Sequence, residues 1–282
     1  MIVVRAETLG MCFGVRDALA LLERVDRPER VTVHGELVHN DEVLRRLESR
    51  GFRQSPEDRR QSLPVTDTVL VTAHGISQRE RARLTTAGKT LLDSTCPLVT
   101  RAHDAARKLE SAGYHVLVIG RPGHVEVRGI VEDLESYTLV PDAESVIAFP
   151  QRRLGVMCQT TTPTRSAERI VAEIRRKNPD ADITYVDTIC LPTKEHQQAL
   201  EDLLGKVGVI VVVGGKGSNN TRQLVERCRD RGVRAHHVEN AADLRHEWFV
   251  GVDRVGLTAG TSTLAETIEA VERRLEGMRD EG

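Results

Sequence analysis

The sequence predicts an α/β protein built from three similar lobes with mainly parallel sheets. Two observations carry this prediction. Six short β-branched runs each lead through a small polar loop into a stretch of helical periodicity. A cysteine motif also recurs along the chain, at Cys12, Cys96 and Cys190. Length alone, at roughly 150 residues per domain, would suggest about two domains. The cysteine repeat instead favours three lobes.

The predicted strands carry the β-branched residues, and the predicted helices carry apolar residues at helical spacing. Helical spacing is clear in Ile170, Val171 and Ile174, and again in Leu264, Ile268, Val271 and Leu275. Strands that alternate with helices form parallel sheets. The six runs are Val31–Val33, Val69–Thr72, Val116–Ile119, Leu154–Met157, Val209–Val213 and Val255–Leu257.

Polar residues collect in the loops that follow these runs. Ligands of open parallel sheets bind beyond the carboxyl ends of the strands. Hydroxyl, amide and imidazole groups beside helix N-termini suit an anion. The alternative is that the Ser, Thr and Asn side chains only cap helices. The loop residues are His34, His39, His74, His124, Glu126, Thr160 to Thr162, Ser218, Asn219, Asn220 and Ser262.

The cysteine motif divides the chain into repeats. The segments 93–98 and 187–192 share an Asp, a hydroxyl residue and a Cys in register, and segment 7–12 begins similarly with two extra residues. A helical pattern follows each cysteine, over 15–22, 98–109 and 194–204. Two strand-loop-helix units lie between consecutive cysteines, which predicts lobes 13–95, 96–186 and 187–282, with 1–12 packing on the third.

Three cysteines at equivalent positions of lobes with approximate threefold symmetry would converge on the axis. Three thiolates suit zinc or iron-sulfur chemistry, and the absence of a C-x-x-C pair disfavours a closed zinc site. Each thiol precedes a predicted helix, where the helix dipole is expected to lower its pKa. The alternative is three unrelated buried cysteines. Cys228 is expected in the core beside Leu224 and Val225, and Cys158 has no assigned role.

Composition excludes several classes of partner. The 40 Lys and Arg against 42 Asp and Glu give a net charge of −2, and a basic surplus for nucleic acid or membrane is absent. No apolar run approaches the roughly 18 residues of a membrane span, and no signal peptide is evident. Five scattered cysteines argue against a disulfide scaffold. We therefore expect a cytoplasmic protein, with a monomer as the default.

A set of ordered motifs runs nearly from end to end. They are Gly10–Val15, Val38–Asn40, Ala73–Gly75, Asp93–Pro97, Gly123–Glu126, Gln159–Thr161, Asp187–Cys190, Gly214–Thr221 and Thr258–Ser262. On these motifs the chain resembles the IspH (LytB) family. The resemblance implies a pseudo-threefold α/β fold around a central iron-sulfur cluster. The chain departs from the family's usual residues at His196, Gly217 and Asn219. These departures affect the expected fit of the substrate more than the expected chemistry.

The resemblance also implies the roles of individual residues. Cys12, Cys96 and Cys190 match the ligands of one 4Fe-4S cluster whose fourth iron stays open for the substrate hydroxyl. Glu126 matches the proton source; its alternative is an exposed glutamate that pairs with Arg121 or Arg128. The residues that match substrate contacts are His39, His74, His124, Thr160, Ser218, Asn219, Asn220 and Ser262, most of them on the diphosphate.

The implied activity is an oxidoreductase of isoprenoid biosynthesis by the non-mevalonate (MEP) pathway. It reductively dehydroxylates 4-hydroxy-3-methylbut-2-enyl diphosphate to isopentenyl and dimethylallyl diphosphates. The segment 214–217 lacks dinucleotide and Walker spacing, so electrons are expected from a ferredoxin or flavodoxin. Two alternatives stay open: a paralogue acting on a related allylic diphosphate, and a non-catalytic protein that binds metal and phosphate.

Overall fold

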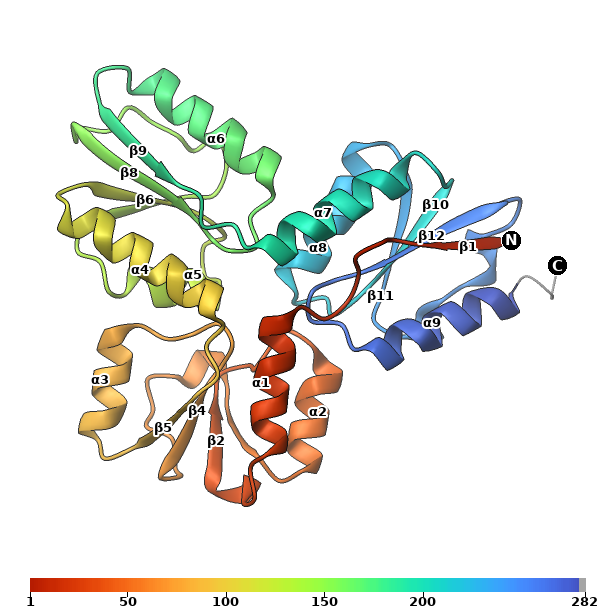
Figure 1. The fold of residues 1–282 in the computed structure, drawn as a ribbon, viewed down its shortest axis with the longest axis horizontal. Coiled ribbons are helices and arrows are strands. Elements are labelled where there is room, and N and C mark those ends of the chain that lie inside the picture. Colours follow the sequence, from red (N-terminus) through yellow and green to blue (C-terminus); the bar gives the residue numbers. More distant parts are fainter. Residues whose placement is uncertain (279–282) are drawn as a thin grey trace. The chain divides into compact units, whose positions relative to one another are not determined.

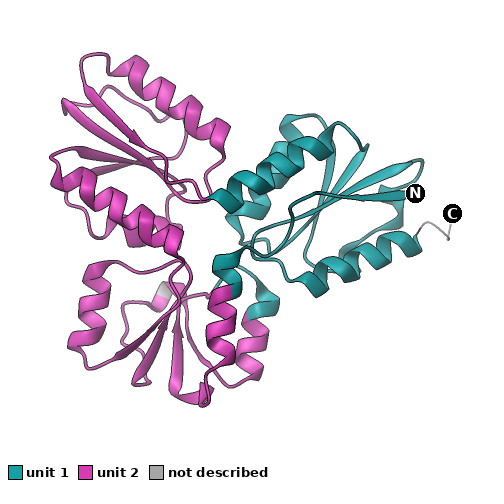
Figure 2. Cartoon of the chain, viewed as in Figure 1, with its two compact units in different colours: residues 1–16, 38–43, 191–282 teal, residues 17–37, 44–190 magenta. Residues whose placement is uncertain are grey.

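The computed structural model describes residues 1–278, so the last four residues of the predicted third lobe lie outside the described residues. The chain divides into two compact units (Figure 2). Unit 1 comprises Met1–Arg16, Val38–Val43 and the described part of Leu191–Gly282, and unit 2 comprises Asp17–Leu37 and Leu44–Cys190. The lobe boundaries expected from the sequence stay a prediction.

Unit 1 contains one parallel sheet of four strands in the order β1-β12-β10-β11 (Figure 1). The strands are β1 (Ile2–Arg5), β10 (Val209–Val213), β11 (Arg234–Val238) and β12 (Arg254–Ala259). The first strand of the chain therefore completes a sheet whose other strands come from its last third, because β1 pairs in parallel with β12.

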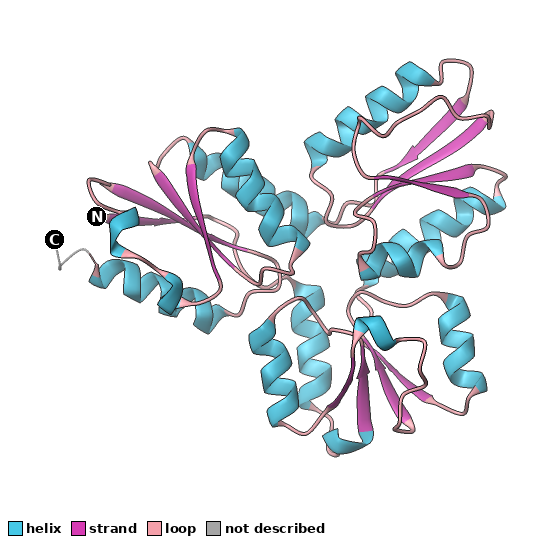
Figure 3. Cartoon of the chain, turned by 180° about the vertical axis from the view of Figure 1, so that it is seen from behind, coloured by secondary structure: helices cyan, strands magenta, loops and turns pink. Residues whose placement is uncertain are grey.

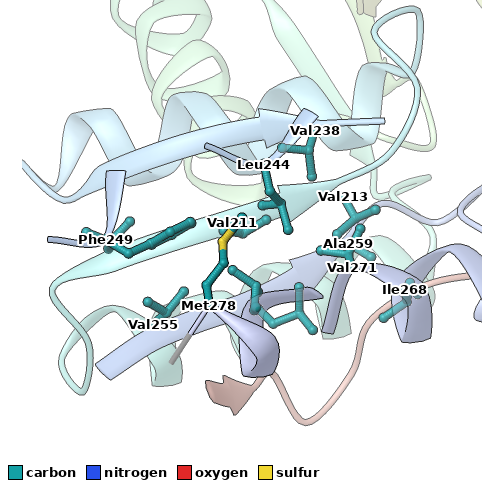
Figure 4. Close-up of a cluster of buried hydrophobic side chains, with 13 residues drawn as sticks. Val211, Val213, Val238, Leu244, Phe249, Val255, Ala259, Ile268, Val271 and Met278 are labelled. Atoms are coloured by element: carbon teal, nitrogen blue, oxygen red, sulfur yellow. The ribbon is translucent and has the colours of Figure 1, made fainter. Parts of the chain in front are cut away.

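Helices cover both faces of this sheet. On one face Ile268, Val271 and Leu275 of α9 (Ala265–Gly277) pack on the valines of β10 (Figure 4). On the other face lie α7 (Leu191–Leu204) and α8 (Asn219–Asp230), and Cys228 is fully buried there, as predicted. Each buried Leu, Ile or Val contributes about 1.5–3 kcal/mol. Two short turns, η3 (Ala241–Asp243) and η4 (His246–Trp248), complete the unit.

Unit 2 contains two further parallel sheets of four strands. The first, in the order β3-β2-β4-β5, consists of β2 (Val31–His34), β3 (Arg53–Ser55), β4 (Thr68–Val71) and β5 (Thr90–Asp93). The second, in the order β7-β6-β8-β9, consists of β6 (His115–Ile119), β7 (Tyr137–Val140), β8 (Arg153–Cys158) and β9 (Asp182–Val186). The strand order is the same in all three sheets once β1 is counted as the fourth strand of the last.

The helices of unit 2 alternate with its strands (Figure 3). In the second sheet α6 (Thr164–Lys177) packs on one face, and α4 (Pro97–Ser111) and α5 (Val125–Val131) pack on the other. The first sheet packs against α3 (Gln78–Thr86) through Leu84. The remaining elements are η1 (Pro28–Arg30), η2 (Glu57–Arg59), and the helices α1 (Phe13–Glu23) and α2 (Asp41–Ser49), which both pass from unit 1 into unit 2.

The predicted fold class is confirmed: three four-stranded parallel sheets alternate with helices. The six predicted strands are the two inner strands of each sheet, although the run predicted to reach Thr72 ends at Val71. The six outer strands were not predicted: all are partly exposed, and, apart from residues 2–4 in β1, they lack a continuous apolar run. No helix among residues 1–278 is long and apolar enough to cross a membrane.

Candidate functional site

Three cysteines occupy the same place in the three repeats. Cys12 directly precedes α1, Cys96 is the N-cap of α4, and Cys190 directly precedes α7. Each follows an outer strand of its sheet, namely β1, β5 or β9. All three are half-buried, whereas Cys158 and Cys228 are fully buried. The predicted placement of the three cysteines at helix starts is therefore confirmed.

The main chain anchors each of these cysteines in an equivalent way. The amide of Cys12 donates to the carbonyl of Thr261 at 3.0 Å, that of Cys96 to Ala73 at 3.1 Å, and that of Cys190 to Thr160 at 2.9 Å. The three accepting residues each lie two positions beyond the end of the neighbouring inner strand, β12, β4 or β8. The cysteine repeat seen in the sequence is thus a repeat of backbone geometry.

The aspartates of the motif shape the two loops that share the Asp-x-x-Cys spacing. Asp93 Oδ1 accepts a bond from the Thr95 amide at 2.9 Å, and Asp187 Oδ1 accepts one from the Ile189 amide at 3.1 Å. An Asp that bonds the amide two residues on forms an Asx-turn. The turn in both loops delivers the cysteine, three residues after the Asp, to the start of the helix.

The pKa of Cys12 departs from the expected direction. Burial raises it, and this effect outweighs the opposing hydrogen bonds from the amides of Val15 and Gly14. Helix-terminal amides therefore act as expected on this thiol, but desolvation has the larger effect on its pKa. The sequence expectation that the helix start lowers this pKa was wrong in net sign.

In unit 2, Glu126 is buried in the first turn of α5, with 2% of its surface exposed. Its Oε1 accepts the Thr160 amide at 2.7 Å, and its Oε2 accepts the Thr160 hydroxyl at 2.9 Å. Its own amide donates to Nδ1 of His124, the N-cap of the helix, at 3.2 Å. The alternative of an exposed glutamate was wrong, since Glu126 is buried; Arg128 pairs with Glu57.

The same carboxylate is linked through Thr160 to a cysteine. Thr160 donates to Glu126 from its amide and hydroxyl and accepts from the Cys190 amide with its carbonyl. His74, which follows β4, lies with its ring edge-to-face on His124, the centroids 5.7 Å apart. Unit 2 thus brings together Glu126, Thr160, His124 and His74 with the loops that carry its two cysteines.

In unit 1, three segments far apart in the sequence come together. The Asn40 side chain donates to the Ser262 carbonyl at 2.7 Å, and the Thr261 amide donates to Asn220 Oδ1 at 3.1 Å. Ser218 caps α8 and accepts the Thr221 amide at 3.3 Å. The predicted residues His39, Ser218, Asn219, Asn220 and Ser262 all lie on these segments, 38–43, 214–221 and 260–263.

Glycines allow these segments to approach closely. A Cβ atom on Gly215 would lie 2.5 Å from the carbonyl oxygen of His39, and one on Gly217 would lie 3.5 Å from the His39 Cβ. The Ser262 hydroxyl is buried without a hydrogen-bond partner among the described residues. Asn219 and Asn220 are also buried, at the start of a helix whose first turn holds no acidic residue. This is the environment that suits an anion.

The predicted site residues divide between the two units. Cys12, His39, Ser218, Asn219, Asn220 and Ser262 belong to unit 1, and the others belong to unit 2. Among residues 1–278, no three His, Cys, Asp or Glu side chains are grouped so that they could hold a metal ion. The set of three cysteine ligands, divided between the units, stays a prediction.

Comparison with known proteins identifies the family. The family described as "LytB protein" matches residues 3–276. The chain belongs to the LytB family. A 4-hydroxy-3-methylbut-2-enyl diphosphate reductase of Methylibium petroleiphilum is 37% identical, over 98% of this chain and 85% of the relative. One of Anaeromyxobacter sp. is 34% identical, over 98% of both.

Solved structures of such reductases share the fold. The E-1-hydroxy-2-methyl-but-2-enyl-4-diphosphate reductase of Plasmodium falciparum matches with a TM-score of 0.88 at 26% identity, over 96% of this chain and 87% of that one. A structure of (E)-4-hydroxy-3-methyl-but-2-enyl diphosphate reductase, titled the terminal enzyme of the non-mevalonate pathway, matches with a TM-score of 0.67 at 31% identity. It covers 98% of this chain and 100% of that one.

The LytB family carries a 4Fe-4S cluster, and the three predicted cysteine ligands have the chemistry that suits such a group. Iron-sulfur clusters are held by cysteine thiolates. The three helices that begin at these cysteines have no acidic residue in the first turn that would repel an anionic cluster. The sequence marked His196 only as a departure from the residue usual in the LytB family and did not predict its contacts, since a histidine in a helical pattern carries no signal of what it touches.

Proposed function

We propose that Glu126, held by Thr160, supplies protons in the reaction of this chain, which is a 4-hydroxy-3-methylbut-2-enyl diphosphate reductase. The reaction is the terminal step of the non-mevalonate isoprenoid pathway. Two electrons and two protons convert the substrate into water and either isopentenyl or dimethylallyl diphosphate. The C4–O bond breaks, one proton leaves in water, and the other joins the allyl carbon skeleton.

The contacts of Glu126 carry the proposal. The carboxyl group is buried, and both oxygens accept hydrogen bonds from Thr160. A buried proton donor whose position is fixed on both oxygens can serve a water-excluding site. The Thr160 hydroxyl, which bonds Glu126, would pass a proton between this carboxyl and a substrate hydroxyl. The Thr160 carbonyl connects the pair to the loop of Cys190.

Cys12, Cys96 and Cys190 would hold the cluster. When bound, a 4Fe-4S cluster with one iron free of protein ligands supplies one-electron transfer and Lewis acidity toward an oxygen ligand. The protein contributes the thiolates and fixes each one through an amide bonded to a neighbouring loop. The described chain shows no nucleotide fingerprint at Gly214–Gly217, and we propose that a ferredoxin or flavodoxin delivers the electrons.

The diphosphate would bind at the segments gathered in unit 1. His74, which belongs to unit 2, stays a predicted diphosphate contact. Ser218, Asn219 and Asn220 stand at the start of α8, and Ser262 adds a buried hydroxyl. His39 lies beside Gly217 on the same unit. Hydroxyl, amide and imidazole donors at a helix N-terminus suit a diphosphate. His124, the N-cap before Glu126, would contact the reacting end of the substrate.

Anaerobic purification followed by iron and sulfide analysis tests the proposal. We expect about four irons and four sulfides per chain, broad visible absorption, and turnover of the substrate that requires a reductant such as dithionite with a redox dye. Stoichiometric zinc without visible absorption would instead indicate a non-catalytic metal protein. A protein that holds the cluster but does not turn over this substrate would indicate a paralogue.

A further inference from the structure

His196 lies in α7 with 3% of its surface exposed, and both of its ring nitrogens meet main-chain carbonyls. Nδ1 lies 2.7 Å from the carbonyl oxygen of Pro192, one helical turn earlier. Nε2 lies 2.9 Å from the carbonyl oxygen of Gly10. The ring therefore joins the N-terminal turn of α7 to a loop that is distant in sequence.

The chemistry of these two partners fixes the protonation of the ring. A carbonyl oxygen only accepts hydrogen bonds, and a neutral imidazole has only one N–H. Both contacts are satisfied together only when both nitrogens carry a proton, which makes the imidazole a cation. His115 provides the contrast: its two nitrogens meet the hydroxyls of Ser136 and Thr138, and hydroxyls can donate or accept, so a neutral ring satisfies both.

The two carbonyls belong to the segments that adjoin two of the cysteines. Gly10 stands two residues before Cys12, and Pro192 stands two residues after Cys190. The Gly10 loop has little freedom to move away, since its amide bonds the Ala259 carbonyl and a Cβ on Gly10 would lie 2.6 Å from Ile268. Gly10 also has φ +83°, a conformation that favours glycine.

We propose that His196 is a cationic positioning residue that fixes the Cys12 loop onto the first turn of α7. Its two hydrogen bonds hold the loop before Cys12 against the helical turn that follows Cys190. Its positive charge offsets the negative charge of thiolates that hold a cluster. The structural link depends only on the contacts within unit 1. The effect on the cluster rests on the proposed function, in which Cys12 and Cys190 are ligands.

Hydrogen exchange of the iron-loaded protein tests the link. His196→Phe keeps a ring but removes both donors, and His115→Phe is the matched control at a buried histidine outside the site. We expect the amides of residues 10–15 to exchange about ten- to a hundredfold faster in His196→Phe, the effect of losing a charge-assisted hydrogen bond. Unchanged exchange, or the same increase in His115→Phe, would overturn the link.

The reduction potential of the cluster tests the charge. His196→Arg keeps a cation with several donors, and His196→Gln is neutral. If the imidazole is a cation, Arg leaves the potential near the wild-type value and Gln makes it more negative. The opposite pattern, with Gln near wild type and Arg more positive, would overturn the proposal. Circular dichroism establishes that each variant is folded.

The two readouts separate this inference from the proposed function. A wild-type protein that binds no cluster would contradict the proposed function, while the exchange of residues 10–15 in the metal-free protein would still decide the link. A loaded cluster with unchanged exchange in both His196→Phe and His196→Gln would contradict the inference alone.

Discussion

Thr160 holds both carboxylate oxygens of Glu126, one through its amide and the other through its hydroxyl. A carboxylate with two convergent bonds has little rotational freedom. The same threonine accepts the Cys190 amide. At the scale of residues, Thr160 thus connects the proposed proton donor, Glu126, with one of the proposed cluster ligands, Cys190.

Replacing Glu126 by Gln should keep the fold and the cluster spectrum but lower turnover by about a hundredfold or more, the usual contribution of a general acid. Gln matches the size of Glu and can still accept the Thr160 amide, while the Thr160 hydroxyl can rotate to accept from the new amide. Steady-state kinetics with the redox-dye assay measure the loss. Glu132→Gln, at the exposed C-cap of the same helix, is the control. Full activity in Glu126→Gln would show that another group donates the proton.

The two cysteines outside the repeat should be dispensable for the cluster. Cys228 packs between α7, α8 and the sheet of unit 1, and Cys158 has its backbone bonded to Thr188 and its thiol 3.6 Å from the Tyr185 hydroxyl. Ser at either position should therefore leave iron per chain unchanged, whereas Cys96→Ser should lower it. Iron analysis after anaerobic purification is the measurement. Loss of iron in Cys158→Ser or Cys228→Ser would refute the ligand assignment.

Among the elements, the inner strands determine where the polar loops meet. β10 and β12 are neighbours in the sheet, so the loops that follow them emerge side by side and bring Asn220 to Thr261. The segment 38–43 joins them through Asn40 and Ser262. Parallel neighbours place their carboxyl ends at one edge, and this explains why Asn220 and Thr261, which are 41 positions apart, meet.

Gly215→Ala should impair this gathering of loops. The added methyl group would lie 2.5 Å from the His39 carbonyl, and relief of such a contact costs about 1–3 kcal/mol. We expect the KM for the diphosphate substrate to rise at least about tenfold, which corresponds to about 1.4 kcal/mol, with iron content unchanged. Gly205→Ala is the matched control, since a Cβ there meets nothing within 4 Å. Equal KM values for the two variants would contradict close packing at Gly215.

For the whole molecule, buried histidine and carboxylate groups set the response to acid. Burial lowers the pKa of His103 to about 4. Burial alone would raise the pKa of Glu80, but hydrogen bonds from Arg83 and His34 outweigh it and lower that pKa to about 2. The folded state favours neutral His103, so its contribution is complete above about pH 6.5 and is lost as pH falls to 4. The contribution of ionised Glu80 is lost only below about pH 4.5.

His103→Leu should therefore flatten the pH dependence of stability between pH 6.5 and 4. Each pKa unit is worth about 1.4 kcal/mol, so the wild type should lose about 3 kcal/mol more than the variant over this range. Urea unfolding followed by circular dichroism at pH 7, 5.5 and 4 measures the difference. Parallel losses in the two proteins would show that His103 is not the group that titrates.

The part of the fold that could be predicted follows from burial. Inner strands such as Val209–Val213 are covered on both faces, and their continuous apolar runs stand out in the sequence. Outer strands such as Arg53–Ser55 and Arg234–Val238 are half exposed, and their composition resembles that of loops. They become strands because a neighbour supplies hydrogen bonds on one side, which no local pattern reveals.

The sequence by itself determined the fold class, the family, and the residue types of the site, because periodicity and motifs are properties of the chain order. The tertiary structure decided what each residue touches. It placed β1 beside β12, bonded both oxygens of Glu126 to Thr160, and brought two carbonyls to the ring of His196. Apart from the Pro192 contact, which lies within one helical turn of His196, these contacts join residues separated by 34 to more than 250 positions. Only the packing of sheets and helices brings such distant groups together.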